Sequence, residues 1–102
     1  MTVSLQVFYP ALPDSRFDHA YYAQTHMELV GRHMGQYLER AIAVRGLSGG
    51  PETPAPYHAV ATLLFATQED MKAAMKASGP VMADIANFTD VEPQILIGAL
   101  IS

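Results

Sequence analysis

The chain of 102 residues is long enough for one domain with a small core, and because half of its residues are hydrophobic we expect self-association to cover part of its surface. Its formal net charge is −4 and its six Lys and Arg residues are scattered singly, which argues against nucleic acid or an anionic membrane as a partner. It has no cysteine, which excludes disulfides, thiolate nucleophiles and thiolate metal sites.

The first half of the chain predicts one strand followed by one helix. Apolar and polar residues alternate over Val3–Tyr9, as in a strand with two different faces. The stretch 17–35 then has helical periodicity, with Asp18 as the expected N-cap. Gly31 weakens the last turns of this helix, so the pattern leaves open whether it continues past His26.

The second half predicts three further strands and a second helical region. Proline and glycine crowd into the stretch 46–56, which indicates an exposed loop between two strands. Thr67 is the expected N-cap of the second helix, which Gly79-Pro80 breaks. The predicted elements are strands over 37–47, 58–66 and 92–101, a helix from Thr67 and a short helical piece over 81–88.

This order, β-α-β-β-α-β, is typical of an α+β, ferredoxin-like fold in which both helices cover one face of a four-stranded antiparallel sheet. We expect a single domain over residues 1–102. The last two strands are apolar on both sides, whereas a sheet face left in water should be polar. The pattern therefore predicts a homodimer, or a higher oligomer, in which the uncovered faces of two sheets meet.

The predicted first helix carries three of the four histidines, at intervals of seven residues. His19, His26 and His33 would lie about 10.5 Å apart along a helix axis, too far for three ligands of one metal ion. His26 and Tyr22 form an i, i+4 pair, in which a neutral imidazole can accept a proton and a phenol can donate to an oxyanion. The alternative is a buried histidine that bonds a backbone carbonyl, with the tyrosine as packing.

Three segments together resemble the EthD-like proteins of the dimeric α+β barrel superfamily. They are FDHAYYAQTHMELV, PYHAVATLLF and ADIANFTDVEPQILIGAL. The resemblance implies a protomer that pairs its sheet with that of a second copy, and a pocket between sheet and helices. It places the signature histidine of the family at His26 and the preceding aromatic residues at Tyr21 and Tyr22. Glu28 stands where the family usually has a helix-bending proline.

We expect a pocket for a small apolar organic molecule, cyclic or aromatic. The candidate lining residues are Phe8, Tyr21, Met34, Tyr37 and Phe65. The first hypothesis is cofactor-independent proton transfer by His26 and Tyr22, of an isomerase, cyclase, decarboxylase or monooxygenase type. The alternatives are a non-catalytic binding or accessory protein of a degradation pathway, and a haem protein with His26 as ligand. We interpret Asp84 as a residue that caps a turn or pairs with a cation.

The sequence shows no motif for nucleotide binding or for zinc-protease chemistry. The proton transfer of the first hypothesis requires no cofactor. The first residues lack the basic and apolar regions of a signal peptide. The longest apolar run, Ile95 to Ile101, is too short to cross a bilayer. We therefore expect a soluble cytoplasmic protein.

Overall fold

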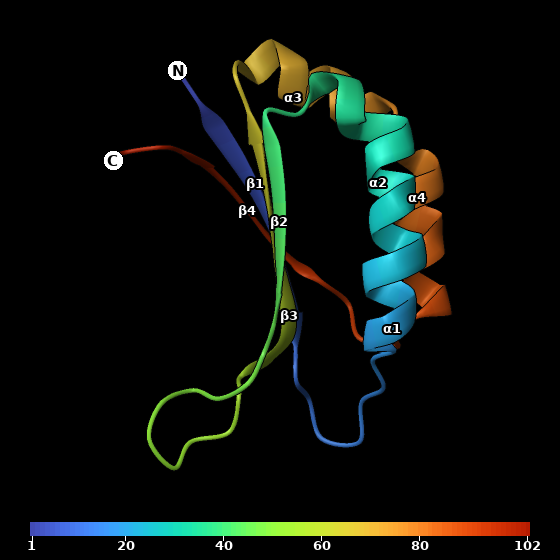
Figure 1. Ribbon diagram of the computed structural model, residues 1–102, viewed down its shortest axis with the longest axis vertical. Coiled ribbons are helices and arrows are strands. Elements are labelled where there is room, and N and C mark those ends of the chain that lie inside the picture. The colour runs from blue at the N-terminus through green and yellow to red at the C-terminus, as the bar shows by residue number, and fades with distance from the viewer.

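The computed structural model describes all 102 residues and has a four-stranded antiparallel sheet with its helices on one face (Figure 1). The strand order β2-β3-β1-β4 confirms the predicted ferredoxin-like α+β fold. Labels with η mark π-helical or 3-10 turns. The elements are β1 (Val3–Pro10), α1 (His19–Tyr21), η1 (Tyr22–His26), α2 (Met27–Met34), η2 (Gly35–Tyr37), β2 (Arg40–Arg45), β3 (Tyr57–Phe65), α3 (Gln68–Lys76), α4 (Gly79–Asp84), η3 (Ile85–Asn87) and β4 (Gln94–Ala99).

Two strands are shorter than predicted, and one helix begins earlier. β2 begins only at Arg40 because the chain continues from α2 into the 3-10 turn η2. β4 begins at Gln94 because Pro93 has no backbone N–H to donate to the ladder. The helix predicted from residue 81 begins at Gly79, since Pro80 is well suited to the first turn of a helix.

The first helix is continuous from α1 through η1 to α2, so it extends past His26 to Met34. It begins where predicted, with the side chain of Asp18 accepting a hydrogen bond from the backbone N–H of Tyr21. Its middle section, η1, is π-helical, and the backbone N–H of Met27 donates to the carbonyl of Tyr22, five residues earlier. Such a turn is a local widening that frequently marks a functional site.

The hydrophobic core lies between the sheet and the helices in two clusters. The larger is aliphatic and includes Leu5, Val30 and Met34. The smaller is centred on Tyr9, Tyr22 and Phe88, whose rings meet edge to face at 5.1–5.6 Å. This aromatic cluster joins β1, the π turn and the segment after α4, and so fixes where the π turn lies above the sheet.

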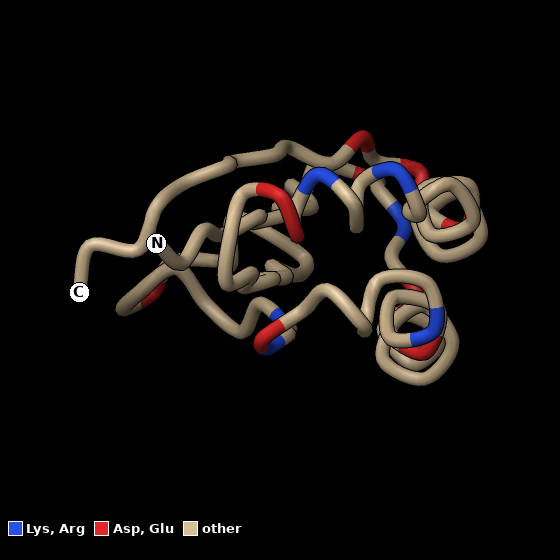
Figure 2. The backbone as a smooth tube through the Cα atoms, turned by 90° about the horizontal axis from the view of Figure 1, so that it is seen from above, with Lys and Arg blue, Asp and Glu red and all other residues tan.

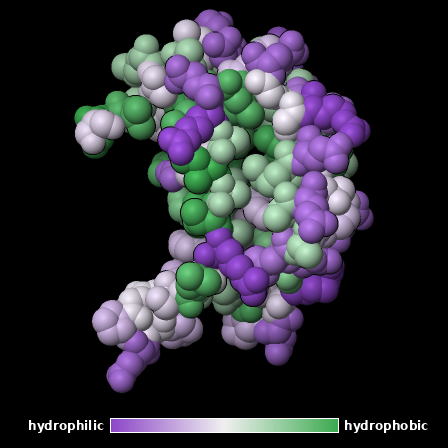
Figure 3. Space-filling model, viewed as in Figure 1, coloured by the Kyte–Doolittle hydropathy of each residue, from purple (hydrophilic) through white to green (hydrophobic).

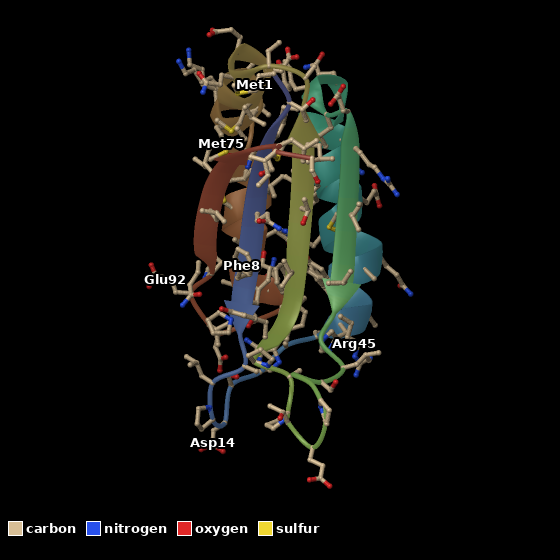
Figure 4. All side chains as sticks on the ribbon, turned by 90° about the vertical axis from the view of Figure 1, so that its left-hand side faces the viewer. Met1, Phe8, Asp14, Arg45, Met75 and Glu92 are labelled. Carbon is tan, nitrogen blue, oxygen red and sulfur yellow. The ribbon has the colours of Figure 1, made fainter.

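No part of the chain covers the other face of the sheet (Figure 1). Phe8 lies in the middle of that face (Figure 4), where its ring packs against Tyr57. Val44 and Leu96 remain 54% and 53% exposed on the same face. Seen in profile, this side of the molecule is a hollow edged by hydrophobic atoms (Figure 3).

Acidic and basic residues are interspersed along the chain (Figure 2). None of the helices has both the length and the apolar character needed to cross a membrane.

Candidate functional site

The central residue of the candidate site is His26, which ends the π turn and is only 4% exposed. Its ring stacks on Tyr22 at a centroid distance of 5.5 Å and packs against Phe88 at 4.5 Å. The rings of Tyr22 and His26 are nearly parallel, at an angle of 17°. The imidazole is therefore packed against the rings of both Tyr22 and Phe88.

Asp84, at the end of α4, holds the His26 ring in a fixed orientation. Its Oδ2 lies 3.0 Å from Nδ1 of His26, and both residues are buried. Its Oδ1 accepts hydrogen bonds from the hydroxyl of Tyr21 at 2.6 Å and from the side-chain amide of Asn87 at 3.0 Å. The carboxylate thus joins the first helix to the segment that follows α4.

These contacts define the protonation states of the pair. Burial raises the pKa of Asp84, but hydrogen bonds from Tyr21, Asn87 and His26 outweigh burial and hold this pKa below its usual value. An ionised carboxylate only accepts, so Nδ1 of His26 carries the proton. Burial lowers the pKa of His26 by more than the hydrogen bond and charge of Asp84 raise it, so the ring is neutral near pH 7. Nε2 is then the unprotonated nitrogen and can accept a proton.

Tyr22 provides a hydroxyl group without a partner next to this imidazole. The hydroxyl is fully buried and makes no hydrogen bond. Burial raises the pKa of Tyr22 to about 12, so the phenol keeps its proton. An unpaired buried hydroxyl costs roughly 1–3 kcal/mol.

Tyr22 and His26 both line an apolar cavity between the helices and the sheet. The cavity has a volume of about 110 Å³. Met27, Met34 and Met82 contribute flexible side chains to its wall. The site therefore places the side chains of Tyr22 and His26 at the wall of an apolar cavity.

Of the five predicted lining residues, Met34 lines this cavity. Tyr21 does not line it and instead bonds Asp84. Phe8 lies on the uncovered face, on the opposite side of the sheet. Phe65 is completely buried within the aliphatic cluster, and Tyr37 packs against the same cluster from the turn after α2, so neither reaches the cavity.

The three helix histidines have separate environments. His19 donates from Nε2 to the backbone carbonyl of His58 at 3.0 Å, so its ring is held against β3. His33 belongs to α2 and does not line the cavity. The π turn disrupts the regular seven-residue spacing, so only His26 lies at the candidate site.

Glu28 is exposed and pairs with Arg32 one turn later on the helix. The local widening at η1 therefore exists without the proline that the family usually has at this position. A haem does not fit the cavity, because a volume of about 110 Å³ is below the ~150 Å³ cavity that holds one benzene molecule.

The fold and the site define a small α+β protein of ferredoxin-like topology with one internal histidine–aspartate site. The EthD domain family model matches residues 11–92 of the chain. The chain therefore belongs to the EthD family.

Several solved structures are similar to this chain. An EthD-like protein from Ralstonia eutropha JMP134 is 31% identical, with a TM-score of 0.91 and coverage of 99% of this chain and 93% of that one. An ethyl tert-butyl ether degradation (EthD) family protein from Bacillus halodurans C-125 is 21% identical, with a TM-score of 0.70 and coverage of 99% and 100%. The cofactor-independent oxygenase SnoaB from Streptomyces nogalater is 10% identical, with a TM-score of 0.60 and coverage of 99% and 94%, and shares the fold. A comparison with curated proteins finds no match.

Proposed function

We propose that this protein is a cofactor-independent enzyme that removes a proton from a small apolar cyclic or aromatic compound. The observation that carries the proposal is the buried His26–Asp84 pair at the cavity, together with the unpartnered hydroxyl of Tyr22. A general base must be unprotonated at the operating pH and held in position, which is the state derived for His26. The fold shared with a cofactor-independent oxygenase adds support.

In the proposed step, Nε2 of His26 accepts a proton from a C–H or O–H group of the substrate. The ring becomes an imidazolium that carries protons on both nitrogens, and the carboxylate of Asp84 stabilises its charge. The hydroxyl of Tyr22 donates a hydrogen bond to the oxygen on which negative charge develops. The deprotonated substrate then isomerises, cyclises or reacts with oxygen, according to its own structure, and the imidazolium returns its proton from Nε2 to the product.

Proton abstraction can be measured directly by exchange of substrate hydrogen for deuterium. The purified protein is incubated in D₂O with a panel of cyclic ketones, lactones and hydroxyarenes, and proton NMR follows the loss of each acidic C–H signal. We expect His26→Gln to reduce the enzymatic exchange by roughly 10²–10⁴-fold. His33→Gln is the matched control, because His33 belongs to the same helix and does not line the cavity.

The results of this experiment discriminate between the two main hypotheses. Parental exchange by His26→Gln would refute the role of the histidine. Ligand binding without exchange for any compound of the panel would favour a non-catalytic binding protein instead.

We further propose that two copies pair through their uncovered sheet faces. Val44 and Leu96 are more than half exposed on that face, and burying one such side chain contributes about 1.5–3 kcal/mol. We expect the protein to be dimeric by sedimentation, and Leu96→Lys to shift it to monomers. Leu47→Lys is the matched control, because Leu47 is 87% exposed in the loop after β2. A monomeric parent protein would refute the pairing.

A further inference from the structure

The cavity wall offers no group that would neutralise a charged ligand. Fourteen of its 17 lining residues are hydrophobic, and the other three are His26, Ser78 and Pro93. The hydroxyl of Ser78 already donates to the backbone carbonyl of Met75 at 2.7 Å. The wall contains no Lys, Arg, Asp or Glu, and the buried carboxylate of Asp84 contacts the wall residue His26.

The surroundings of the cavity are also acidic where they reach the surface. A shallow hollow between α4 and β4 shares Met82 and Pro93 with the cavity, and it adds Asp90 and Glu92. No Lys or Arg lines this hollow. Figure 4 shows Glu92 beside the edge of the sheet that β4 forms. Met82 is 50% exposed at this boundary, so its mobile side chain lies between solvent and cavity.

We infer that the site selects a compact, uncharged weak acid about the size of one ring, such as a simple phenol, and rejects carboxylates. A carboxylate would pass an acidic rim and lose its hydration in an apolar wall beside a buried carboxylate, all of which disfavour binding. The cavity volume of about 110 Å³ is somewhat below the ~150 Å³ of a cavity that holds benzene, so a single ring fits only when the flexible methionine side chains of the wall move slightly, and larger ligands are disfavoured. This inference rests on the proposed function, because it concerns the same cavity. It adds which kind of molecule binds there.

A matched pair of probes separates charge from size. 4-Methylphenol and 4-hydroxybenzoate share a phenol ring. The first carries a methyl group at the position where the second carries a carboxylate. Titrations at pH 7 are followed by calorimetry and by the carbon-13 NMR signals of the methionine methyl groups. Met27, Met34, Met75 and Met82 line the cavity, whereas Met1 and Met71 do not and serve as internal references. We expect 4-methylphenol to shift the signals of the four lining residues, and 4-hydroxybenzoate to bind at least about tenfold more weakly.

A variant at the mouth tests the electrostatic cause. Met82→Lys places a cation at a half-exposed position and is expected to raise the affinity for 4-hydroxybenzoate several-fold relative to the affinity for 4-methylphenol. Met82→Gln is the uncharged control. Equal affinity of the parent protein for both probes would overturn the inference, as would absence of 4-methylphenol binding or an equal gain from Met82→Gln. Selective binding of 4-methylphenol without deuterium exchange on any substrate would uphold the inference while refuting the proposed function.

Discussion

Replacing Asp84 by asparagine is expected to reverse the tautomer of His26. The carboxylate accepts three hydrogen bonds, two at Oδ1 from Tyr21 and Asn87 and one at Oδ2 from His26. An asparagine keeps the first two bonds if its amide oxygen takes the place of Oδ1, and its NH₂ group then faces Nδ1 of His26. In the opposite orientation the Tyr21 hydroxyl can accept from the NH₂ group, but the NH₂ groups of the two asparagine side chains face each other and the bond from Asn87 is lost, so the first orientation is favoured.

With the NH₂ group facing it, Nδ1 must accept a hydrogen bond, and the ring proton moves to Nε2. Keeping the proton on Nδ1 would leave two donors 3.0 Å apart, at a cost of roughly 1–3 kcal/mol for each unpaired group. About 1.4 kcal/mol corresponds to a tenfold population ratio, so the Nε2–H tautomer is expected to dominate. Nε2 is then no longer a base, and the corresponding substitution in serine proteases lowers turnover by about 10⁴-fold.

Nitrogen-15 NMR of the histidine rings measures this change without any substrate. The parent protein is expected to show a protonated Nδ1 at His26 and the variant a protonated Nε2. Asp90→Asn is the control, because Asp90 is exposed and accepts only the backbone N–H of Arg16, which an asparagine oxygen can also accept. A parent spectrum with Nε2 protonated, or an Asp84→Asn spectrum identical to that of the parent, would refute the reasoning.

Two further predictions concern stability. Tyr22→Phe removes the unpaired buried hydroxyl and is expected to raise the free energy of unfolding by about 1 kcal/mol, measured in urea, while it slows substrate deuterium exchange at least about tenfold. A destabilised Tyr22→Phe protein would show that the hydroxyl has a partner. Because the pKa of His26 is lowered in the folded state, the unfolded chain binds more protons below about pH 6.5. The free energy of unfolding should therefore decrease as the pH is lowered, by up to about 1.4 kcal/mol per pH unit for this residue. Burial and the neighbouring His19 also lower the pKa of His58, so some pH dependence is expected without His26. Between pH 7 and 5, the free energy of unfolding of His26→Gln in urea should change less with pH than that of the parent. An unchanged pH dependence would contradict the buried neutral state of His26.

The sequence was sufficient for those features that depend on neighbouring residues. The caps at Asp18 and Thr67 follow from short side chains that accept a backbone N–H three residues later, and both form as predicted. The alternation of β1 placed Phe8 on the opposite side from Val7 and Tyr9, and it lies there in the structure. Because side chains alternate between the two faces of a strand, Phe8 cannot lie on the face that the helices cover. The prediction that Phe8 lines the pocket was therefore inconsistent with the alternation of β1.

The partner of His26 could not be found in this way. Asp84 is 58 positions away and meets His26 only because the segment after α4 packs against the first helix. Its neighbours Asn87 and Asp90 have side chains that commonly form turns, so a local interpretation of Asp84 as a turn residue was equally consistent with the pattern. The π turn is likewise invisible to helical periodicity, because it interrupts the spacing that the periodicity measures.

The arrangement around Asp84 is more easily explained by chemistry than by stability. Burying an ionised carboxylate carries a desolvation cost that its hydrogen bonds have to offset, so a buried carboxylate with three neutral donors brings little net stability. The unpaired hydroxyl of Tyr22 adds a further cost. An apolar cluster such as the one formed by Leu5, Val30 and Met34 could fill the same space without either cost. Because the costs fall on Tyr22, which lines the apolar cavity, and on Asp84, which bonds the lining residue His26, they support a role for that cavity in proton transfer.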